Sequence, residues 1–144
     1  MDIEQRMENN ELVIAAFDGD MEDIVRLLDT GVDINQDGQC WNPLHAAVEN
    51  DQLESVRLLI EKGADMEKRA DPKKAGIDCP PLDHAVDAAC DCAAQSGTPG
   101  AEVRTDIITR LLSAGADPKT GLKYAKLYGS ARIMDLLSAA NEAR

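Results

Sequence analysis

Three oxygen-bearing side chains at alternating positions could bind calcium. Asp33, Asn35 and Asp37, followed by Gly38, match the opening of an EF-hand loop, in which carboxylate and amide oxygens ligate the ion. The same loop needs a bidentate carboxylate at its twelfth position, and the twelfth residue counted from Asp33 is Leu44. We therefore expect no metal site here, and we interpret Asp37-Gly38 as a tight turn.

Cysteine and histidine side chains form a second possible reactive cluster. Cys90 and Cys92 are two residues apart, and Cys79 and His84 precede them. Residues two apart on a helix point in different directions, and the C-x-x-C spacing of structural zinc sites is absent. Cys79 and His84 could pair as nucleophile and base, but no third, orienting group follows at a recognisable spacing. We expect no catalytic residue and no cofactor. A metal- or thiol-dependent enzyme is an alternative function.

Composition favours a helical protein with a protein partner. The 144 residues are 44% hydrophobic but only 3% aromatic, so the core must consist of Leu, Ile, Val and Ala, which suits close-packed helices. The 27 acidic residues outnumber the 15 basic ones and give a net charge of −12. Such a chain repels phosphate backbones and attracts basic proteins, so we expect a basic protein partner and no nucleic acid.

The sequence also indicates a cellular compartment. The first residues are acidic and polar, without the apolar segment of a signal peptide, and no apolar run reaches the length of a membrane span. Four cysteines in a chain of this length do not make a disulfide framework. We expect a cytoplasmic protein with no membrane contact.

An internal repeat organises the chain. Three segments carry an apolar helical stripe that ends at a glycine, where a left-handed cap would stop the helix. They are RLLDTGVDIN (26–35, with Gly31), RLLIEKGADME (57–67, with Gly63) and RLLSAGADPK (110–119, with Gly115). A fourth stripe at 133–140 lacks the glycine. The recurrence predicts stacked units, each ending in an amphipathic helix.

A shorter apolar helix is expected before each stripe. The four segments are LVIAAF (12–17), PLHAAV (43–48), PLDHAV (81–86) and LKYAKLYG (122–129). Proline can open a helix because the amide it lacks would have no partner there. Small residues recur at Ala15, Ala47, Ala85 and Ala125, where they would allow close approach of neighbouring helices.

These features resemble the ankyrin repeat, whose signature is T-P-L-H-x-A with a period near 33 residues. The match is closest at Asn42-Pro43-Leu44-His45-Ala46-Ala47, with Asn in place of Thr. The resemblance implies an all-α ankyrin-repeat solenoid with short β-turn fingers, and a structural role for His45, whose ring would bond to repeat backbone. We expect one domain spanning 1–144, with units at about 11–42, 43–80, 81–119 and a cap at 120–144.

The third unit is expanded. Gly31 and Gly63 are 32 residues apart, whereas Gly63 and Gly115 are 52 apart. Part of the excess falls in the link at 66–80. The rest lies between the two helices of the unit. There the helical pattern of residues 81–95 continues until Gly97-Thr98-Pro99-Gly100 breaks it. The long helix could pair with a second chain. In contrast, the link from Gly115 to the fourth unit is too short for a finger.

The resemblance implies that partners bind at the finger tips and at the exposed end of each first helix. The corresponding partner-binding residues are Phe17, Asp18, Trp41, Glu49, Asn50, Asp87 and Tyr128. Trp41 and Phe17 are the only Trp and the only Phe, and buried aromatic anchors often dominate interface energies. The alternative for both is that they cover the edge of the core.

A basic cluster interrupts the acidic chain. Lys68, Arg69, Lys73 and Lys74 lie in the link at 66–80, either as a solvated loop tip or as a contact with an acidic surface. The implied function is non-catalytic protein binding through an acidic concave surface. The chain also resembles small bacterial ankyrin proteins without other domains, some of which are immunity proteins that block a toxin, so an immunity role is the alternative.

Overall fold

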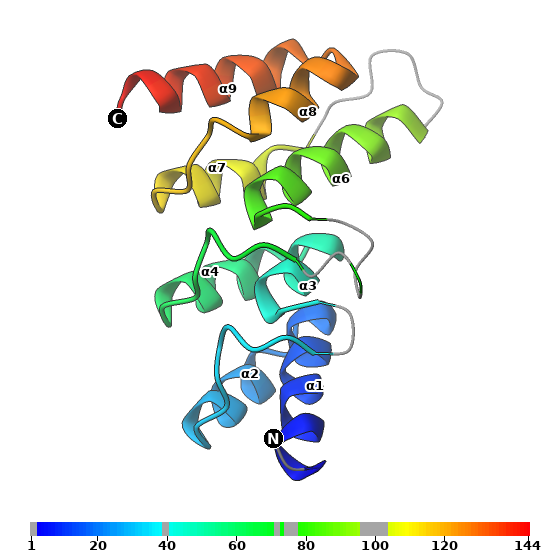
Figure 1. Cartoon of the computed structure of the whole chain (residues 1–144), viewed down its shortest axis with the longest axis vertical. Helices are drawn as coiled ribbons and strands as arrows, with labels where there is room; N and C mark the ends of the chain where they lie inside the picture. The colour runs from blue at the N-terminus through cyan, green and yellow to red at the C-terminus, as the bar shows by residue number, and fades with distance from the viewer. Residues whose placement is uncertain (1–2, 39–40, 71–72, 74–77, 96–103) are drawn as a thin grey trace. The chain divides into compact units, whose positions relative to one another are not determined.

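The computed structural model describes residues 3–38, 41–70, 73, 78–95 and 104–144, with the side chains of 3–9 and 92–94 outside the description. Regular structure within these ranges is entirely α-helical, which confirms the predicted all-α repeat fold. The chain divides into two compact units, residues 1–81 and 82–144 (Figure 1). None of the described helices is long and apolar enough to cross a membrane.

The first unit contains two pairs of helices. They are α1 (Ile3–Asp18), α2 (Met21–Asp29), α3 (Pro43–Glu49) and α4 (Leu53–Glu61). Helix α1 packs against α2 and α3, and α3 packs against α4. The core of this unit is aliphatic, as composition predicted; its most buried large members include Leu12, Ile24, Leu27, Val56 and Leu59.

The second unit repeats the arrangement with α6 (Pro81–Gln95), α7 (Asp106–Ser113), α8 (Gly121–Tyr128) and α9 (Ala131–Glu142). Its core residues again come from one stripe per helix: Leu82, Val86, Ile108, Leu111, Ile133 and Leu137. The four recurring alanines, Ala15, Ala47, Ala85 and Ala125, are all buried. They stand where a larger side chain would hold neighbouring helices apart.

The repeated glycines end their helices as predicted. Gly31, Gly63 and Gly115 have φ values of 95°, 93° and 102°, in the left-handed region that a side chain disfavours. The residue after each glycine donates its N–H to the carbonyl five residues earlier, as in Ala64 to Leu59 at 2.9 Å. These are Schellman motifs, which satisfy carbonyls that the helix end leaves open.

Helix α1 begins nine residues before the short helix expected at 12–17. Residues 3–11 contain no Gly or Pro, and their Glu, Gln, Arg and Met residues have good helix propensity. The prediction treated this stretch as outside the repeat because it lacks an apolar stripe. Helix α6, in contrast, runs to Gln95 as the pattern of residues 81–95 indicated; the predicted break at 97–100 lies outside the described residues.

An aspartate two residues after each glycine shapes the following link. The side chains of Asp33, Asp65 and Asp117 accept a hydrogen bond from the backbone N–H two residues later, at 2.9, 2.9 and 3.0 Å. Such bonds fix a turn locally. The last link keeps the aspartate bond and then enters α8 at Gly121, so its finger is shortened rather than missing.

The interpretation of Asp37-Gly38 as the turn is wrong. The hydrogen-bonded turn runs from Asp33 to Gln36, whose N–H donates to the Asp33 carbonyl at 3.1 Å. Gly38 is needed for a different reason: a Cβ built there would lie 2.7 Å from Val13 Cγ2 of α1. The finger therefore packs directly onto the first helix.

Each finger of the first unit is closed by a backbone bond at its base. The Gly38 N–H donates to the Trp41 carbonyl at 2.9 Å, and the Ala70 N–H donates to the Cys79 carbonyl at 3.1 Å. Two residues separate the first pair and eight separate the second. The extra length of the second link thus lies between Ala70 and Cys79.

Candidate partner-binding surface

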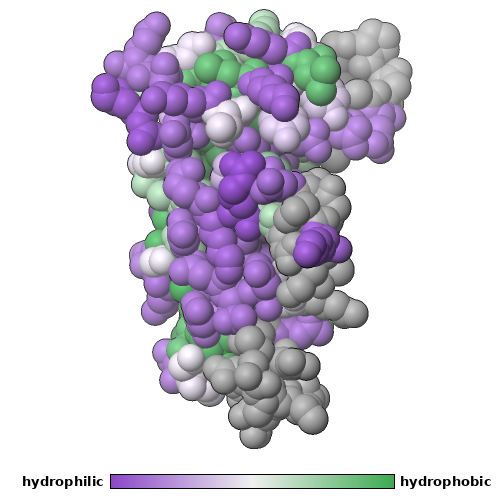
Figure 2. Space-filling model, in the orientation of Figure 1, coloured by the Kyte–Doolittle hydropathy of each residue, from purple (hydrophilic) through white to green (hydrophobic). Residues whose placement is uncertain are grey.

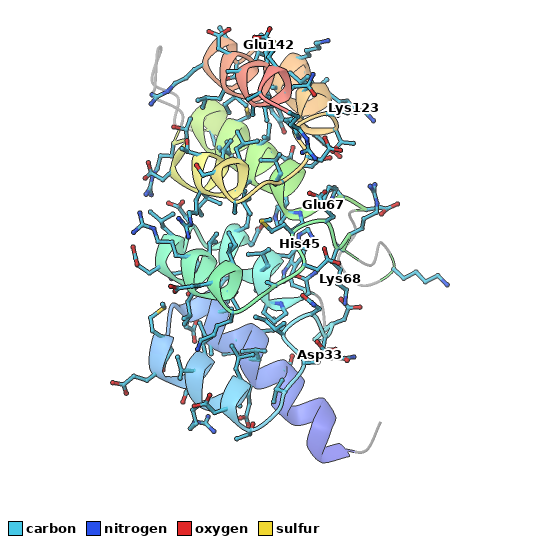
Figure 3. All side chains as sticks on the ribbon, turned by 90° about the vertical axis from the view of Figure 1, so that its left-hand side faces the viewer. Asp33, His45, Glu67, Lys68, Lys123 and Glu142 are labelled. Carbon is cyan, nitrogen blue, oxygen red and sulfur yellow. The ribbon has the colours of Figure 1, made fainter. Side chains whose placement is uncertain are left out.

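His45 joins helix α3 to the finger that follows α4. Its ring is fully buried, and its Nε2 lies 3.2 Å from the Lys68 carbonyl. A carbonyl only accepts, so Nε2 carries the proton and donates. The two residues lie close together in Figure 3. This is the structural role that the ankyrin resemblance implied for His45.

Trp41 covers this histidine. The two rings are stacked with centroids 6.1 Å apart and planes 16° from parallel, and Trp41 is half-buried. One side of the indole therefore contributes to the fold, and its remaining surface is open. Both readings of Trp41, as a cover for the core edge and as an anchor for a partner, stay compatible with this position.

In the second unit, Asp83 occupies the position of His45, as the third residue of α6. Its buried carboxylate accepts a hydrogen bond from the Thr120 hydroxyl at 2.8 Å. Thr120 is the fifth residue after Gly115, as Lys68 is after Gly63. The two units thus make the same helix-to-finger connection with different chemical groups.

Asn50 connects one repeat to the previous one. Its side-chain amide donates to the Phe17 carbonyl at 2.8 Å, although the side chain is exposed. The bond satisfies a carbonyl in the last turn of α1, which would otherwise lack a partner. Asn50 was predicted to face a partner, and its donor group serves the fold as well.

Tyr128 and Asp87 form the equivalent connection in the second unit. The Tyr128 hydroxyl donates to the Asp87 carboxylate at 3.0 Å. This bond, with smaller contributions from burial and from the nearby negative charge, raises the pKa of Tyr128 from 10.0 to about 12. The sequence placed both residues among the partner-binding set without anticipating that they bond to each other.

The remaining predicted site residues are exposed. Asp18 and Glu49 end α1 and α3 on the surface, and Phe17 is 38% exposed. Within the first unit, the structure therefore joins Phe17 to Asn50, and Asp18 and Glu49 lie exposed on the surface. Nothing in this arrangement tests whether these residues bind a partner, so that role stays a prediction.

The described members of the basic cluster are engaged within the chain. The Lys68 ammonium donates to the Asn35 carbonyl and lies 3.5 Å from an Asp37 oxygen. Arg69 donates to the side chain and the backbone oxygen of Asp78, both at 2.7 Å. Lys68 is therefore partly buried against the preceding finger, whereas Arg69 stays exposed while it pairs with Asp78. Lys74 lies outside the described residues.

The side chains with the calcium-like spacing also have structural partners. The Asn35 side-chain oxygen accepts the Asp65 N–H at 2.7 Å, which ties consecutive fingers together. Asp33 shapes its own turn, and Asp37 pairs with Lys68. Among the described residues, no three His, Cys, Asp or Glu side chains are grouped closely enough to hold a metal.

The described cysteines are small buried side chains. Cys79 and Cys90 are both buried. Burial and the nearby Asp87 raise the pKa of the Cys90 thiol, so the thiol form, a poor nucleophile, is favoured. Cys40 and the side chain of Cys92 lie outside the described residues.

One exposed aliphatic residue was missing from the predicted positions: Ile14, which is 51% exposed on α1. Three apolar residues in a row, Leu12 to Ile14, cannot all face one side of a helix, because successive residues turn by about 100°. That run was the available signal for Ile14. The repeat places Leu127 beside Tyr128 at the exposed end of the first helix of the fourth unit, and Leu127 is 77% exposed on α8.

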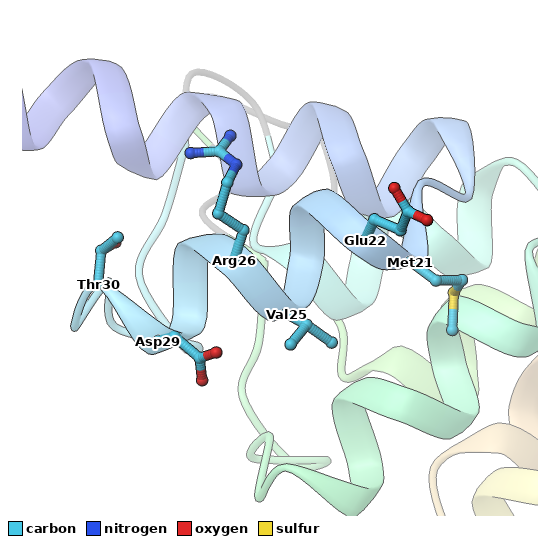
Figure 4. Close-up of a pocket in the computed structure, with 6 residues that line it drawn as sticks. All are labelled: Met21, Glu22, Val25, Arg26, Asp29 and Thr30. Carbon is cyan, nitrogen blue, oxygen red and sulfur yellow. The ribbon is translucent and has the colours of Figure 1, made fainter.

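The surface has shallow hollows over the first unit. One lies along α2 and is lined by residues of that helix and its cap: Met21, Glu22, Val25, Arg26, Asp29 and Thr30 (Figure 4). Another lies between α1 and α2, lined by Glu11, Ile14, Ala15, Asp18, Asp20 and Asp23. Neither gathers the nucleophile, base and orienting group that covalent chemistry needs.

Charge is distributed unequally between the units. Residues 1–81 contain 19 acidic and 8 basic side chains, whereas residues 82–144 contain 8 and 7. Almost all of the net charge of −12 therefore belongs to the first unit. Hydrophilic residues dominate the face seen in Figure 2, with green areas where apolar residues reach the surface.

Comparison with known proteins agrees with this architecture. Residues 2–70 match the family described as ankyrin repeats in three copies. The chain is 36% identical over 64 residues to the 2-5A-dependent ribonuclease of Mus musculus, covering 43% of this chain and 9% of that protein. It is also 36% identical over 69 residues to alpha-latrocrustotoxin-Lt1a of Latrodectus tredecimguttatus, covering 46% of this chain and 5% of the other. The chain thus spans less than a tenth of the length of these relatives.

Proposed function

Residues 2–70 are ankyrin repeats, and on that premise we propose that this chain is a non-catalytic module that binds a basic protein. Ankyrin repeats are in general protein-interaction modules, because a stack of repeats presents an extended, preformed surface. A preformed surface loses little conformational entropy on binding. The observation that carries the proposal is the concentration of acidic residues in residues 1–81.

The proposed contact surface in the first unit consists of Phe17, Asp18, Trp41, Glu49 and Asn50. Phe17 and the open side of Trp41 would supply apolar area, and the carboxylates of Asp18 and Glu49 would steer a cationic partner. Asn50 holds the Phe17 carbonyl and so fixes the end of α1 beside them. Asp87 and Tyr128 are the residues proposed to contact a partner in the second unit.

The test is capture of proteins from the native cell extract by the wild-type chain and by an Asp18→Asn/Glu49→Gln variant. These two side chains are exposed, so the variant should fold normally. Asp135→Asn/Glu142→Gln, also exposed, makes the same change of charge on α9 and is the matched control.

We expect a basic protein that the wild type and the control retain and that the Asp18/Glu49 variant loses. Its affinity should fall as salt concentration rises, because screening weakens the attraction. Retention of the same protein by all three chains would exclude this surface. A captured protein of acidic character would contradict the proposed charge complementarity.

Inhibition of a toxin, as in immunity proteins, is a special case of the same proposal. Its support is the negative charge of the first unit, which suits a basic toxin. We propose a cytoplasmic location, consistent with the buried thiol of Cys90. Co-expression of the captured protein with and without this chain would test the immunity role: it requires toxicity that this chain relieves.

A further inference from the structure

Large apolar side chains that reach the surface fall into two pairs. Among the described residues, they are Ile14 and Phe17 on α1, 51% and 38% exposed, and Leu127 and Tyr128 on α8, 77% and 39% exposed. Ile14 and Phe17 are three residues apart and share one face of α1, whereas Leu127 and Tyr128 are consecutive and point in different directions from α8. Exposed large apolar residues often mark interaction surfaces.

The pair on α1 is surrounded by carboxylates. Ile14 shares the hollow between α1 and α2 with Glu11, Asp18, Asp20 and Asp23. Asp23 is paired with Arg26 at 3.0 Å, and Asp20 caps α2. We call this group, Glu11, Ile14, Phe17, Asp18, Asp20 and Asp23, the α1 patch. It is an apolar surface with a strongly negative border.

Two amines border Leu127 on α8. Lys123, Lys126 and Leu127 are spaced three and four residues apart, so they share one face of α8, and all three are exposed. Lys123 extends from α8 to the surface in Figure 3. Tyr128 is left out of this group, because its hydroxyl bonds the Asp87 carboxylate. We call Lys123, Lys126 and Leu127 the α8 patch. It is an exposed apolar side chain with a positive border.

We propose that the α1 patch of one copy of this chain binds the α8 patch of a second copy. The two patches match in both respects: each offers exposed apolar surface, Ile14 and Phe17 on α1 and Leu127 on α8, and their borders have opposite charge. Opposite potentials favour this orientation and disfavour pairing of two α1 patches, where carboxylates would face each other. The α1 patch shares Phe17 and Asp18 with the surface proposed above for a basic partner, so a second copy and that partner would compete for it. The self-association does not rest on the proposed function, because it needs no other protein.

The proposed contact joins two different surfaces, so it is heterologous and leaves one patch of each kind free at the ends of a dimer. Association can therefore continue to longer assemblies as concentration rises. The interface is small and bordered by exposed charges, so it should be weak and sensitive to salt. The third-unit helix α6 has no part in it.

The test is sedimentation velocity of the purified chain at low and high ionic strength over about a hundredfold range of concentration. At low ionic strength, we expect the average mass to rise above the 15.6 kDa of the monomer as concentration increases. High ionic strength should weaken the association about tenfold or more. A monomer at every concentration in low salt would overturn the proposal.

Two variants separate this head-to-tail contact from other modes of dimerisation. Ile14→Ser/Asp18→Lys blocks the α1 patch, and Lys123→Glu/Leu127→Ser blocks the α8 patch; all four positions are exposed. Each variant should be monomeric alone. An equimolar mixture should form a dimer that stops at two chains, because one intact patch of each kind is left. If the mixture stays monomeric, or if either variant associates alone as the wild type does, the proposal is wrong.

Matched controls place the same charges elsewhere. Asp135→Lys on α9 repeats the charge change of Asp18→Lys, and Lys62→Glu after α4 repeats that of Lys123→Glu; both residues are exposed. These controls should associate as the wild type does. Loss of association in either control would show that net charge, and not the two patches, governs self-association.

Discussion

In residues 1–81, the third residue of α3 is His45, and its ring bonds the backbone carbonyl of Lys68. In residues 82–144, the third residue of α6 is Asp83, and its carboxylate bonds the side chain of Thr120. The eighth residue counted from the start of α3 or α8 shows the same contrast. Asn50 bonds the backbone of Phe17, whereas Tyr128 bonds the side chain of Asp87.

The two units thus make hydrogen bonds at the same positions of the repeat with different residue types. A bond to a backbone carbonyl is available whatever side chain the partner residue carries. A bond between two side chains requires both identities at once. The bonds of His45 and Asn50 should therefore survive changes at Lys68 and Phe17 that keep the backbone in place, although the Lys68 side chain also pairs with Asn35 and Asp37. The corresponding bonds of the second unit require Thr120 and Asp87 themselves.

The largest effect is expected at His45. His45→Ala removes a fully buried ring, its bond to Lys68 and the surface on which Trp41 stacks. We expect it to lower the free energy of unfolding by about 2–4 kcal/mol, measured by chemical denaturation followed by circular dichroism. Lys68→Ala leaves the carbonyl in place and should cost less. If Lys68→Ala lowers the free energy of unfolding as much as His45→Ala does, the bond between His45 and the Lys68 carbonyl does not account for the loss of stability.

The second unit allows a stricter test with Asp83 and Thr120. We expect the double-mutant cycle of Asp83→Ala and Thr120→Val to give a coupling energy of about 1–2 kcal/mol, because the bond involves a charged acceptor. The same cycle for His45→Ala and Lys68→Ala should give a smaller coupling energy, since His45 bonds only the backbone carbonyl of Lys68. Equal coupling energies in the two cycles would show that the two units do not differ in this respect.

A smaller effect is expected at the start of α3. The Asn42 side-chain oxygen caps the helix by accepting the His45 N–H at 3.0 Å, while its buried Nδ2 has no hydrogen-bond partner among the residues that the structure describes. Asn42→Ala should cost about 1 kcal/mol of stability, whereas Asn42→Thr keeps a capping oxygen and removes the unpaired donor. Thermal denaturation should show Asn42→Thr at least as stable as wild type. Equal losses in both variants would contradict this account.

The smallest effect on stability concerns Tyr128, where titration is the better probe. Its hydroxyl donates to Asp87, and its pKa is raised from 10.0 to about 12. A raised pKa means that the contribution of this bond is complete below the ordinary tyrosine range and is lost as pH rises toward about 12. In a Tyr124→Phe background, ultraviolet titration should show late ionisation, and Asp87→Asn should return it toward 10.0. An unchanged titration in Asp87→Asn would show that the bond does not persist in solution.

Much of the architecture could be predicted from local patterns. The glycine stops, the buried alanines and the length of α6 each depend on a few neighbouring residues. The ankyrin signature around Asn42-Pro43-Leu44-His45 also identified the role of His45. The start of α1 was missed because residues 3–11 show good helix propensity but no apolar stripe, and the stripe was the feature that the repeat search used.

The candidate site was less predictable. Its positions follow from the repeat, but the bonds of Asn50, Asp87 and Tyr128 join residues 33 and 41 positions apart in the sequence. The role of Lys68 was missed for the same reason, because its partners Asn35 and Asp37 belong to the preceding finger. A charged residue in a polar link gives no sign of such a partner.

The sequence by itself determined where helices stop, which residues turn the chain and how much charge each unit carries, because these depend on near neighbours or on composition. Only the tertiary structure decided which exposed side chains are open and which are bonded to the next repeat. That outcome depends on how consecutive repeats stack, which brings Phe17 beside Asn50 and Asp87 beside Tyr128. Stacking also left Ile14 and Leu127 on the surface, where apolar residues with neighbours of opposite charge can meet a second chain.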